Sequence, residues 1–324
     1  MKAIVFDRYG GPDVLGLREL DTPEPKDDQV LVRVHAASVN PIDWHRLRGQ
    51  PLFVRGSEGF RRPRNTGLGA DLSGTVEQVG RDVTTLRPGD EVFGMSIRTL
   101  AEYAAVAAEG VVAKPANLSF EQAAAVPLAA LTAAQALRRA GELEPGRSVL
   151  VNGASGGVGT FAVQIAKALG ADVTAVCSTR NVELVGSLGA DEVVDYTRED
   201  FTRRGRRHDL VVDTVMNRSL GALRRAATED GAIVLVGAAK GRSGGRPMLR
   251  FVRAMVGRRF AGQQVVTFLT ERNRDDLLLV KELIEAGKVV PAIDRTYPLA
   301  ETADAIRYLE QGHARGKVVV AVAG

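Results

Sequence analysis

The segment Asn152–Thr160 contains the residues whose types and spacing point most directly to chemistry. It reads Asn-Gly-Ala-Ser-Gly-Gly-Val-Gly-Thr, with an apolar run before it and a helical pattern after it. Its glycines allow a sharp turn and let backbone amides approach a pyrophosphate, while the start of the helix adds a partial positive charge. The first glycine interval is one residue longer than in G-x-G-x-x-G. We predict that Asn152 and six further residues of this turn bind a dinucleotide: Gly153, Ser155, Gly156, Gly157, Val158 and Gly159.

The end of the next apolar strand indicates which dinucleotide is bound. NAD sites commonly place an acid there, on the ribose 2′-hydroxyl. Here Cys177 is followed by Ser178, Thr179, Arg180 and Asn181, with no acid among them. A guanidinium suits a phosphate, and Ser178 offers a hydroxyl. The sequence therefore predicts NADPH, with Arg180 at the 2′-phosphate; a solvated residue at the start of a helix is the alternative for Arg180.

The sequence pattern changes near residue 119, and the two patterns predict two domains that position these residues. As far as about residue 118 the chain shows short alternating runs between turn residues, which are typical of a β-rich module. From 119 to 289 apolar strands alternate with helical patterns, and Ser119 is expected to cap a helix that runs to Leu137. This predicts an α/β domain with a doubly wound parallel sheet. The closing apolar run, Gly316–Val322, is expected to return to the first domain, which then spans 1–118 and 290–324.

Composition narrows the class of protein. The chain has 324 residues, 45% of them hydrophobic and 25% charged, as in ordinary globular proteins. No apolar run reaches the roughly 18–20 residues of a membrane span, and Asp7 comes too early for a signal peptide. We therefore expect a cytoplasmic protein with no membrane partner. The single cysteine, Cys177, cannot form an internal disulfide and is interpreted as a small strand residue. The whole chain has a net charge of +4 and contains clusters of arginine, but no nucleic-acid motif accompanies these clusters.

Taken together, several motifs resemble the zinc-independent quinone oxidoreductase branch of the medium-chain dehydrogenase/reductase superfamily. Besides the glycine turn, the motifs that carry the resemblance are Ala37–Asp43, Gly69–Val76, Pro88–Val92 and Gly312–Val319. The resemblance runs nearly from end to end. It implies a GroES-like barrel domain, a Rossmann domain and a cleft between them. It also implies a dimer or tetramer, and we expect a homodimer that forms through an edge strand near 264–268.

The resemblance also bears on zinc. The positions that match the Cys and His ligands of zinc-dependent relatives are Asn40 and Ala70, and the chain lacks the four cysteines of their structural zinc loop. Alanine cannot bind a metal and an amide binds zinc poorly. The four histidines, His35, His45, His208 and His313, show no ligand spacing. We therefore expect no bound metal.

Roles for other positions follow from the resemblance. It implies that six residues besides the glycine turn and Arg180 surround the cofactor: Ser178, Asn181, Tyr196, Val236, Gly237 and Lys317. Some relatives carry lysine in place of Asn181. Thr132 would bond the carboxamide, although a helix-surface hydroxyl is an alternative interpretation. Phe268 would form a wall of the substrate pocket.

Without a metal, side chains must stabilise the charge that develops on the substrate oxygen. Asn40 is our predicted donor, with a structural amide as the alternative. His45 could relay a proton, since its ordinary pKa suits that task. Asp43 is expected to brace the loop, and Trp44 to pack in or beside the cleft. The stretch 49–60, which includes Phe53, is expected to be irregular and to border the substrate pocket.

Three functions remain open from sequence alone. The first is an NADPH-dependent reductase of a quinone, an enone or a similar small carbonyl. The second is an enoyl-thioester reductase, for which Arg61, Arg62 and Arg64 could supply a basic approach channel. The third is a non-catalytic NADPH-binding sensor or interaction protein. Turnover of NADPH with an enone would separate the first two from the third.

Overall fold

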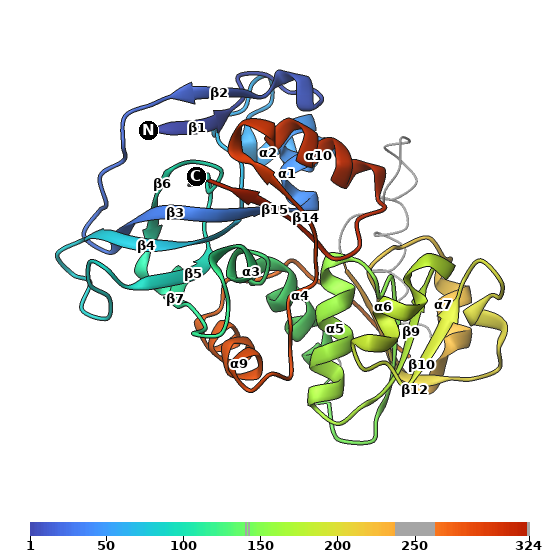
Figure 1. The fold of residues 1–324 in the computed structure, drawn as a ribbon. Helices are drawn as coiled ribbons and strands as arrows, with labels where there is room; N and C mark the ends of the chain where they lie inside the picture. Colours follow the sequence, from blue (N-terminus) through green and yellow to red (C-terminus); the bar gives the residue numbers. More distant parts are fainter. Residues whose placement is uncertain (140, 142, 237–262, 323–324) are drawn as a thin grey trace. The chain divides into compact units, whose positions relative to one another are not determined.

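The computed structural model describes residues 1–139, 141, 143–236 and 263–322 (Figure 1). Its backbone contacts divide the chain into two compact units. The first contains 1–128, 272–285 and 291–324, and the second contains 129–271 and 286–290. The segment 272–285 thus groups with the first unit, whereas the sequence pattern predicts it within the 119–289 domain. The reason is local: Arg274 donates to the Val111 carbonyl at 2.9 Å, and Asn117 donates to the Ile284 carbonyl at 2.9 Å.

The first unit is built on a seven-stranded sheet in the order β14-β15-β3-β4-β5-β7, with β6 also paired to β3. A separate antiparallel ribbon joins β1 to β2. The strands of this unit are β1 (Lys2–Val5), β2 (Gly16–Glu19), β3 (Gln29–Val39), β4 (Asp71–Val79), β5 (Glu91–Met95), β6 (Tyr103–Ala107), β7 (Val111–Ala113), β14 (Ile293–Pro298) and β15 (Lys317–Ala321).

The pairing of β15 makes the first unit discontinuous in sequence. This closing strand lies antiparallel to β3, with Val318 opposite Val39, and β3 in turn places Ser38 opposite Asp71 of β4. Strands from both ends of the chain therefore meet, and their alternating apolar residues fill two buried clusters. The same registers bring Lys317, Asn40 and Asp71 to one level of the sheet.

Helices of the first unit hold its polar residues in place. They are α1 (Pro41–Arg48), α2 (Phe53–Glu58), α3 (Phe120–Ala124), α9 (Arg274–Glu285) and α10 (Thr302–Gln311). Proline suits the first position of α1, because its missing N–H would have no partner in the helix. Gly49 ends α1 with a φ of 57°, a left-handed conformation that glycine adopts at little cost. The presence of α2 corrects the expectation that 49–60 is irregular throughout.

The second unit has a six-stranded parallel sheet in the order β10-β9-β8-β11-β12-β13. Its strands are β8 (Ser148–Asn152), β9 (Asp172–Cys177), β10 (Glu192–Asp195), β11 (His208–Asp213), β12 (Ala227–Leu235) and β13 (Gln264–Thr267). Its helices are α4 (Pro127–Arg138), α5 (Gly157–Ala168), α6 (Val182–Ser187) and α7 (Leu220–Ala226). The central strands are almost wholly buried, which agrees with their continuous apolar sequence.

One predicted helix is two helices. Ser119 caps α3 as expected, and its hydroxyl accepts the Gln122 N–H at 3.2 Å. The chain then breaks after Ala125 and a new helix, α4, begins at Pro127. Proline lacks the N–H that would continue the first helix, but it is compatible with the first turn of the second. Of the helices that the structure describes, none has both the length and the apolar composition of a membrane span.

Candidate active site

The glycine turn in the second unit has the geometry of a phosphate cradle. Gly153 has a φ of 86°, and a Cβ on it would lie 2.4 Å from Thr214 Oγ1. A Cβ on Gly159 would lie 2.1 Å from the Gly153 carbonyl oxygen. Gly156 is the residue before α5, so the first amides of that helix have no partner within it. Small residues are therefore required here, and the exposed amides suit an anion.

The end of β9 is fastened to this turn. Asn181 donates its amide to Ser155 Oγ at 2.8 Å and to Ser178 Oγ at 3.3 Å. Three predicted cofactor residues therefore lie together, with Asn181 buried and engaged in positioning the turn. Its Oδ1 is buried and has no hydrogen-bond partner among the described residues. Arg180 lies exposed beside it, in a short 3-10 turn.

Asp213 is a buried acid that sequence reasoning missed. It ends β11 and stands opposite Asn152, whose amide donates to Asp213 Oδ1 at 2.8 Å. The same oxygen accepts the N–H groups of Val215 and Met216, while Oδ2 is buried and unpartnered in the described structure. Burial raises the pKa of this carboxyl above its ordinary value. The available signal was an acid that ends an apolar strand at the carboxyl edge of a parallel sheet, where ligands bind.

The remaining predicted residues of the second unit lie apart from the turn or have local partners. Thr132 lies in α4 and its hydroxyl is 2.6 Å from that of Thr270. Phe268 is half-buried, with the Arg139 guanidinium 5.0 Å from its ring centre. Tyr196 is exposed after β10, and Val236 is buried after β12. Gly237 lies outside the described residues.

In the first unit, Asn40 is the centre of a buried polar cluster. Its Nδ2 donates to Asp71 Oδ2 at 2.8 Å and to the Ser38 carbonyl at 3.3 Å. Its Oδ1 accepts a hydrogen bond from Lys317 Nζ at 2.5 Å. Both amide hydrogens are thus donated within the protein. The structural interpretation of Asn40 fits this geometry, and the predicted role of direct donor to the substrate does not.

The charged members of this cluster are Asp71 and Lys317. Their side chains are almost completely buried, and Nζ of Lys317 lies 3.1 Å from Asp71 Oδ2. Asp71 also accepts the Ser38 hydroxyl at 2.6 Å. A buried ion pair persists where further hydrogen bonds support it, and here the amide of Asn40 also donates to Asp71. Two of the three N–H groups of Lys317 are used in this way, and the third has no partner among the described residues.

Asp43 is bonded to backbone groups at the start of α1. Its carboxylate accepts the Asn40 N–H at 2.8 Å and the Gly69 N–H at 2.9 Å. The side chain is wholly buried, and desolvation raises its pKa to about 6 despite these two bonds. Asp43 therefore ties the helix to the loop before β4.

His45 and Trp44 each have one polar ring atom for which the described part of the chain supplies no partner. The Nδ1 atom of His45 lies 2.7 Å from the Gln50 carbonyl, so that nitrogen carries the proton. Its Nε2 is buried without a partner in the described parts of the chain, as is Nε1 of Trp44. The two rings are in contact and tilted by 31° to one another, with centroids 3.7 Å apart. Burial lowers the pKa of His45 below its ordinary value of 6.5. A buried imidazole with one open nitrogen is suited to proton transfer.

Other reactive groups have structural partners. The ring of His35 lies 4.2 Å from that of Phe120, and His208 Nε2 is 3.1 Å from the Thr174 hydroxyl. Burial raises the pKa of Cys177 to about 11, which keeps its thiol protonated and unreactive. In the described residues, no group of three or more His, Cys, Asp or Glu side chains could hold a metal ion.

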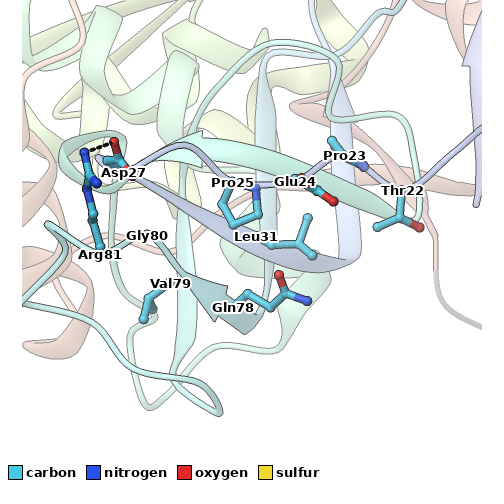
Figure 2. Close-up of a pocket in the computed structure, with 10 residues that line it drawn as sticks. All are labelled: Thr22, Pro23, Glu24, Pro25, Asp27, Leu31, Gln78, Val79, Gly80 and Arg81. Carbon is cyan, nitrogen blue, oxygen red and sulfur yellow. Dashed lines mark ion pairs between the residues drawn. The ribbon is translucent and has the colours of Figure 1, made fainter.

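A surface groove of about 430 Å³ lies away from these residues (Figure 2). It runs beside the ends of β3 and β4, between residues 22–31 and 78–81. An ion pair between Arg81 and Asp27, 2.8 Å long, occupies one end. None of its lining residues is a predicted site residue, and its only charged pair is neutralised, so we assign it no chemistry.

Comparison with known proteins agrees with this arrangement. Residues 26–116 match the alcohol dehydrogenase GroES-like domain, and residues 188–320 match a zinc-binding dehydrogenase family. The chain is 37% identical to 2-methylene-furan-3-one reductase of Solanum lycopersicum, over 99% of this chain and 79% of that protein. It is also 37% identical to the chloroplastic NADPH-dependent alkenal/one oxidoreductase of Arabidopsis thaliana, over 99% of this chain and 79% of that protein.

A solved structure extends the comparison to the fold. The quinone oxidoreductase of Coxiella burnetii has 33% identity and a TM-score of 0.84, covering 100% of this chain and 99% of its own. The glycine turn, the presence of one sheet in each unit and the end-to-end similarity all agree. The chain therefore belongs to the zinc-independent quinone oxidoreductase branch of the medium-chain dehydrogenase/reductase superfamily.

Proposed function

We propose that this enzyme uses NADPH to reduce the conjugated double bond of a small enone or quinone, without a bound metal. The observation that carries the proposal is the glycine cradle, in which Gly153 and Gly159 leave no room for a side chain. Support for the substrate class comes from relatives that are named as reductases of alkenals, enones and quinones. A homodimer and a cytoplasmic location stay predictions.

The second unit supplies the cofactor site in this proposal. The amides at the start of α5 would hold the pyrophosphate, and Arg180 would pair with the 2′-phosphate. Asn181 and Asp213 would position the turn and the strand ends around it, because each already bonds to a residue of the cradle. Their unpartnered oxygens, Oδ1 and Oδ2, are suited to accept hydroxyl or amide protons of the cofactor. When bound, NADPH supplies the hydride.

Stabilisation of the developing negative charge falls to Lys317. Hydride addition at the β-carbon moves an electron pair onto the carbonyl oxygen of the substrate. The third N–H of the Lys317 ammonium can meet that oxygen, while Asn40 and Asp71 hold the other two in place. A charged donor fixed in a buried setting stabilises an oxyanion more than a mobile one does. Asn40 then acts as a positioning residue.

The proton that completes the reduction is assigned to His45. Its ring is fixed by the Gln50 carbonyl, and only Nε2 remains to exchange a proton. In its protonated form, His45 can donate from Nε2 to the α-carbon or the enolate oxygen. Asp43 stays outside the chemistry, because both of its oxygens accept backbone N–H groups.

The first experiment is to follow NADPH oxidation with benzoquinone, phenanthrenequinone and a simple alkyl vinyl ketone. NADH is run in parallel, and each assay is repeated with a chelator. We expect turnover that resists the chelator and strongly prefers NADPH. NADPH binding without turnover of any of these substrates would contradict the proposal and favour a non-catalytic role; loss of turnover with chelator would contradict the metal-free mechanism.

A further inference from the structure

Five exposed arginines of the first unit form a charged surface that the proposed reaction does not use. They are Arg8, Arg61, Arg62, Arg64 and Arg98, and we call them the arginine rim. None of them forms an ion pair with any residue that the structure describes. Asp7, the neighbour of Arg8, pairs with Arg18, and Glu58, which precedes Arg61, pairs with Arg46. The rim therefore keeps its full positive charge.

Backbone contacts gather these arginines around one segment. Val5 pairs with Gly67 as an antiparallel bridge, so Arg8 and Arg64 each lie within three residues of the same point. Three extended residues reach about 10 Å at most. The side chain of Arg98 packs directly over Gly67, where a Cβ would lie 2.8 Å from its Cγ.

The other two rim residues are tied to the same place. Arg61 and Arg62 follow Gly59, whose carbonyl accepts the hydroxyl of Tyr9. Tyr9 is the neighbour of Arg8 in the chain, so the start of 59–64 lies beside the end of the β1 segment. The five charges thus belong to one face of the unit and are not scattered over it.

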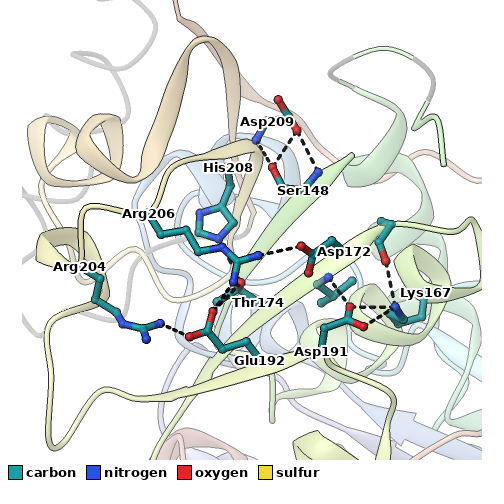
Figure 3. Close-up of polar contacts among 12 residues, drawn as sticks. Ser148, Lys167, Asp172, Thr174, Asp191, Glu192, Arg204, Arg206, His208 and Asp209 are labelled. Carbon is teal, nitrogen blue, oxygen red and sulfur yellow. Dashed lines mark hydrogen bonds and ion pairs between the residues drawn. The ribbon is translucent and has the colours of Figure 1, made fainter. Parts of the chain in front are cut away.

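In the basic run 203–207 of the second unit, Arg204 and Arg206 show what neutralised arginines look like (Figure 3). Arg204 pairs with Glu192 at 2.6 Å, and Arg206 pairs with both Asp172 and Glu192. That run is held within a network of acids at the amino-terminal edge of the parallel sheet. Among the described residues, no acid pairs with an arginine of the rim in this way. Unpaired positive charge attracts an anionic ligand.

The rim adjoins the residues assigned to proton transfer. Arg46 of α1 forms a buried pair with Glu58 at 2.8 Å, at the end of α2, two residues before Phe60. His45 precedes Arg46 in the same helix and bonds to the carbonyl of Gln50. The helices α1 and α2 therefore link His45, whose Nε2 has no partner among the described residues, to the rim.

Apolar side chains stand among the charges. Phe60 is 74% exposed and precedes Arg61, while Ile97 is 57% exposed and precedes Arg98. A ligand that covers both kinds of group needs phosphates for the arginines and an apolar or aromatic portion for Phe60 and Ile97. A small neutral enone carries no phosphate.

We propose that the arginine rim binds the phosphorylated tail of the substrate, so that the enzyme reduces an enoyl group joined by a thioester to a nucleotide-bearing pantetheine arm. This inference rests on the proposed function, since the same site would carry out the reduction. The β-carbon gains the hydride and the α-carbon gains a proton, while NADPH is oxidised to NADP⁺. The thioester bond stays intact, so no further reactant is needed.

The test compares two substrates that differ only in the tail. Crotonyl-coenzyme A carries the phosphates, and the crotonyl thioester of N-acetylcysteamine carries none. Each is assayed with the parent enzyme and with the triple variant Arg61→Gln, Arg62→Gln, Arg64→Gln. The matched control is Arg147→Gln, Arg203→Gln, Arg207→Gln, which removes three charges at exposed sites of the second unit. A neutral vinyl ketone and the KM for NADPH serve as internal references.

We expect kcat/KM for the coenzyme A thioester to fall at least about tenfold in the rim variant, mainly through KM, and to fall with rising salt. The N-acetylcysteamine thioester, the vinyl ketone and the control variant should be unaffected. Titration of coenzyme A itself onto the enzyme with NADP⁺ gives a second readout that needs no turnover, and its affinity should drop in the same variant.

The proposal would be overturned if kcat/KM fell equally for both thioesters in the rim variant, or if it fell equally in the control variant. It would also be overturned if coenzyme A bound equally well to the parent enzyme and to the rim variant. If the vinyl ketone is reduced but neither thioester is, the inference fails and the proposed function stands. If no substrate is reduced, the proposed function itself fails, and the coenzyme A titration still decides whether the rim binds a phosphorylated tail.

Discussion

Arg180 is the residue on which the choice between the two nicotinamide cofactors rests. It is exposed at the end of β9, beside the buried amide that holds the glycine turn. A charge-assisted bond to the 2′-phosphate contributes roughly 1.5–3 kcal/mol, which corresponds to about 10- to 150-fold in affinity. Arg180→Ala should weaken NADPH binding by that factor and leave NADH binding nearly unchanged. Titrating both cofactors checks this, and a parallel loss for NADH would contradict it.

His45 should set the pH dependence of turnover. Burial holds its pKa below 6.5, so the protonated form that donates is depleted as pH rises through that lowered value. Turnover limited by proton donation should therefore fall with rising pH, within the range of about pH 5–8 where histidine titrates. In His45→Gln the fall should disappear together with most of the activity. Profiles of kcat against pH that keep the same shape in both proteins would remove His45 from the mechanism.

At the scale of elements, the junction of β8 with α5 tolerates only glycine at position 159. A Cβ there would lie 2.1 Å from a backbone carbonyl, which cannot move aside as a flexible side chain could. Gly159→Ala should weaken NADPH binding at least about tenfold and destabilise the fold by roughly 1–3 kcal/mol. Gly186→Ala, in a helix with open space around it, is the control and should be neutral or stabilise by about 0.5–1 kcal/mol. Fluorescence titration and thermal unfolding measure both effects, and equal behaviour of the two variants would refute the argument.

The start of α1 depends on Asp43. The pKa of its carboxyl is about 6 in the folded chain, against an ordinary value of 3.8, so the folded protein binds an extra proton between these values. Stability contributed by this group is therefore present below about pH 4 and declines as pH rises to about 6, by up to about 3 kcal/mol.

The side chain in Asp43→Asn cannot titrate. The free energy of unfolding of this variant should therefore fall less between about pH 4 and 7 than that of the parent protein. At every pH, one backbone N–H in the variant loses its acceptor. Denaturant unfolding at several pH values is the measurement. Parallel curves for the two proteins would show that Asp43 keeps its charge in the folded state.

For the whole molecule, β13 is where we expect two copies to join. It is the last strand of the six-stranded sheet in the described structure, and Leu269, just beyond it, is 88% exposed. An apolar side chain beside an open strand edge favours pairing with a second chain. Leu269→Glu should shift the protein from dimer to monomer in sedimentation, whereas Leu52→Glu, at another exposed leucine, should not. A parent protein that sediments as a monomer would contradict the prediction.

Features that depend on neighbours in the chain could be predicted from the amino-acid order alone. The glycines of the phosphate cradle could be identified because a turn and the helix after it are local, and their spacing encodes both. The strands β8, β9, β11 and β12 could be identified because each is a continuous apolar run. The absence of an acid after β9 led to the preference for NADPH, and the capping pair at Ser119 predicted the start of α3.

The way in which distant residues combine depends on the folded chain. Asn40, Asp71 and Lys317 meet because β15 pairs with β3 and β3 pairs with β4, and no local pattern encodes those registers. That meeting uses both amide hydrogens of Asn40, and for this reason we propose Lys317 as the donor to the substrate. Burial and partners likewise separated the neutralised arginines at 204 and 206 from the open rim. The sequence shows which side chains are charged. Whether a partner neutralises each charge depends on contacts between segments that are far apart in the chain.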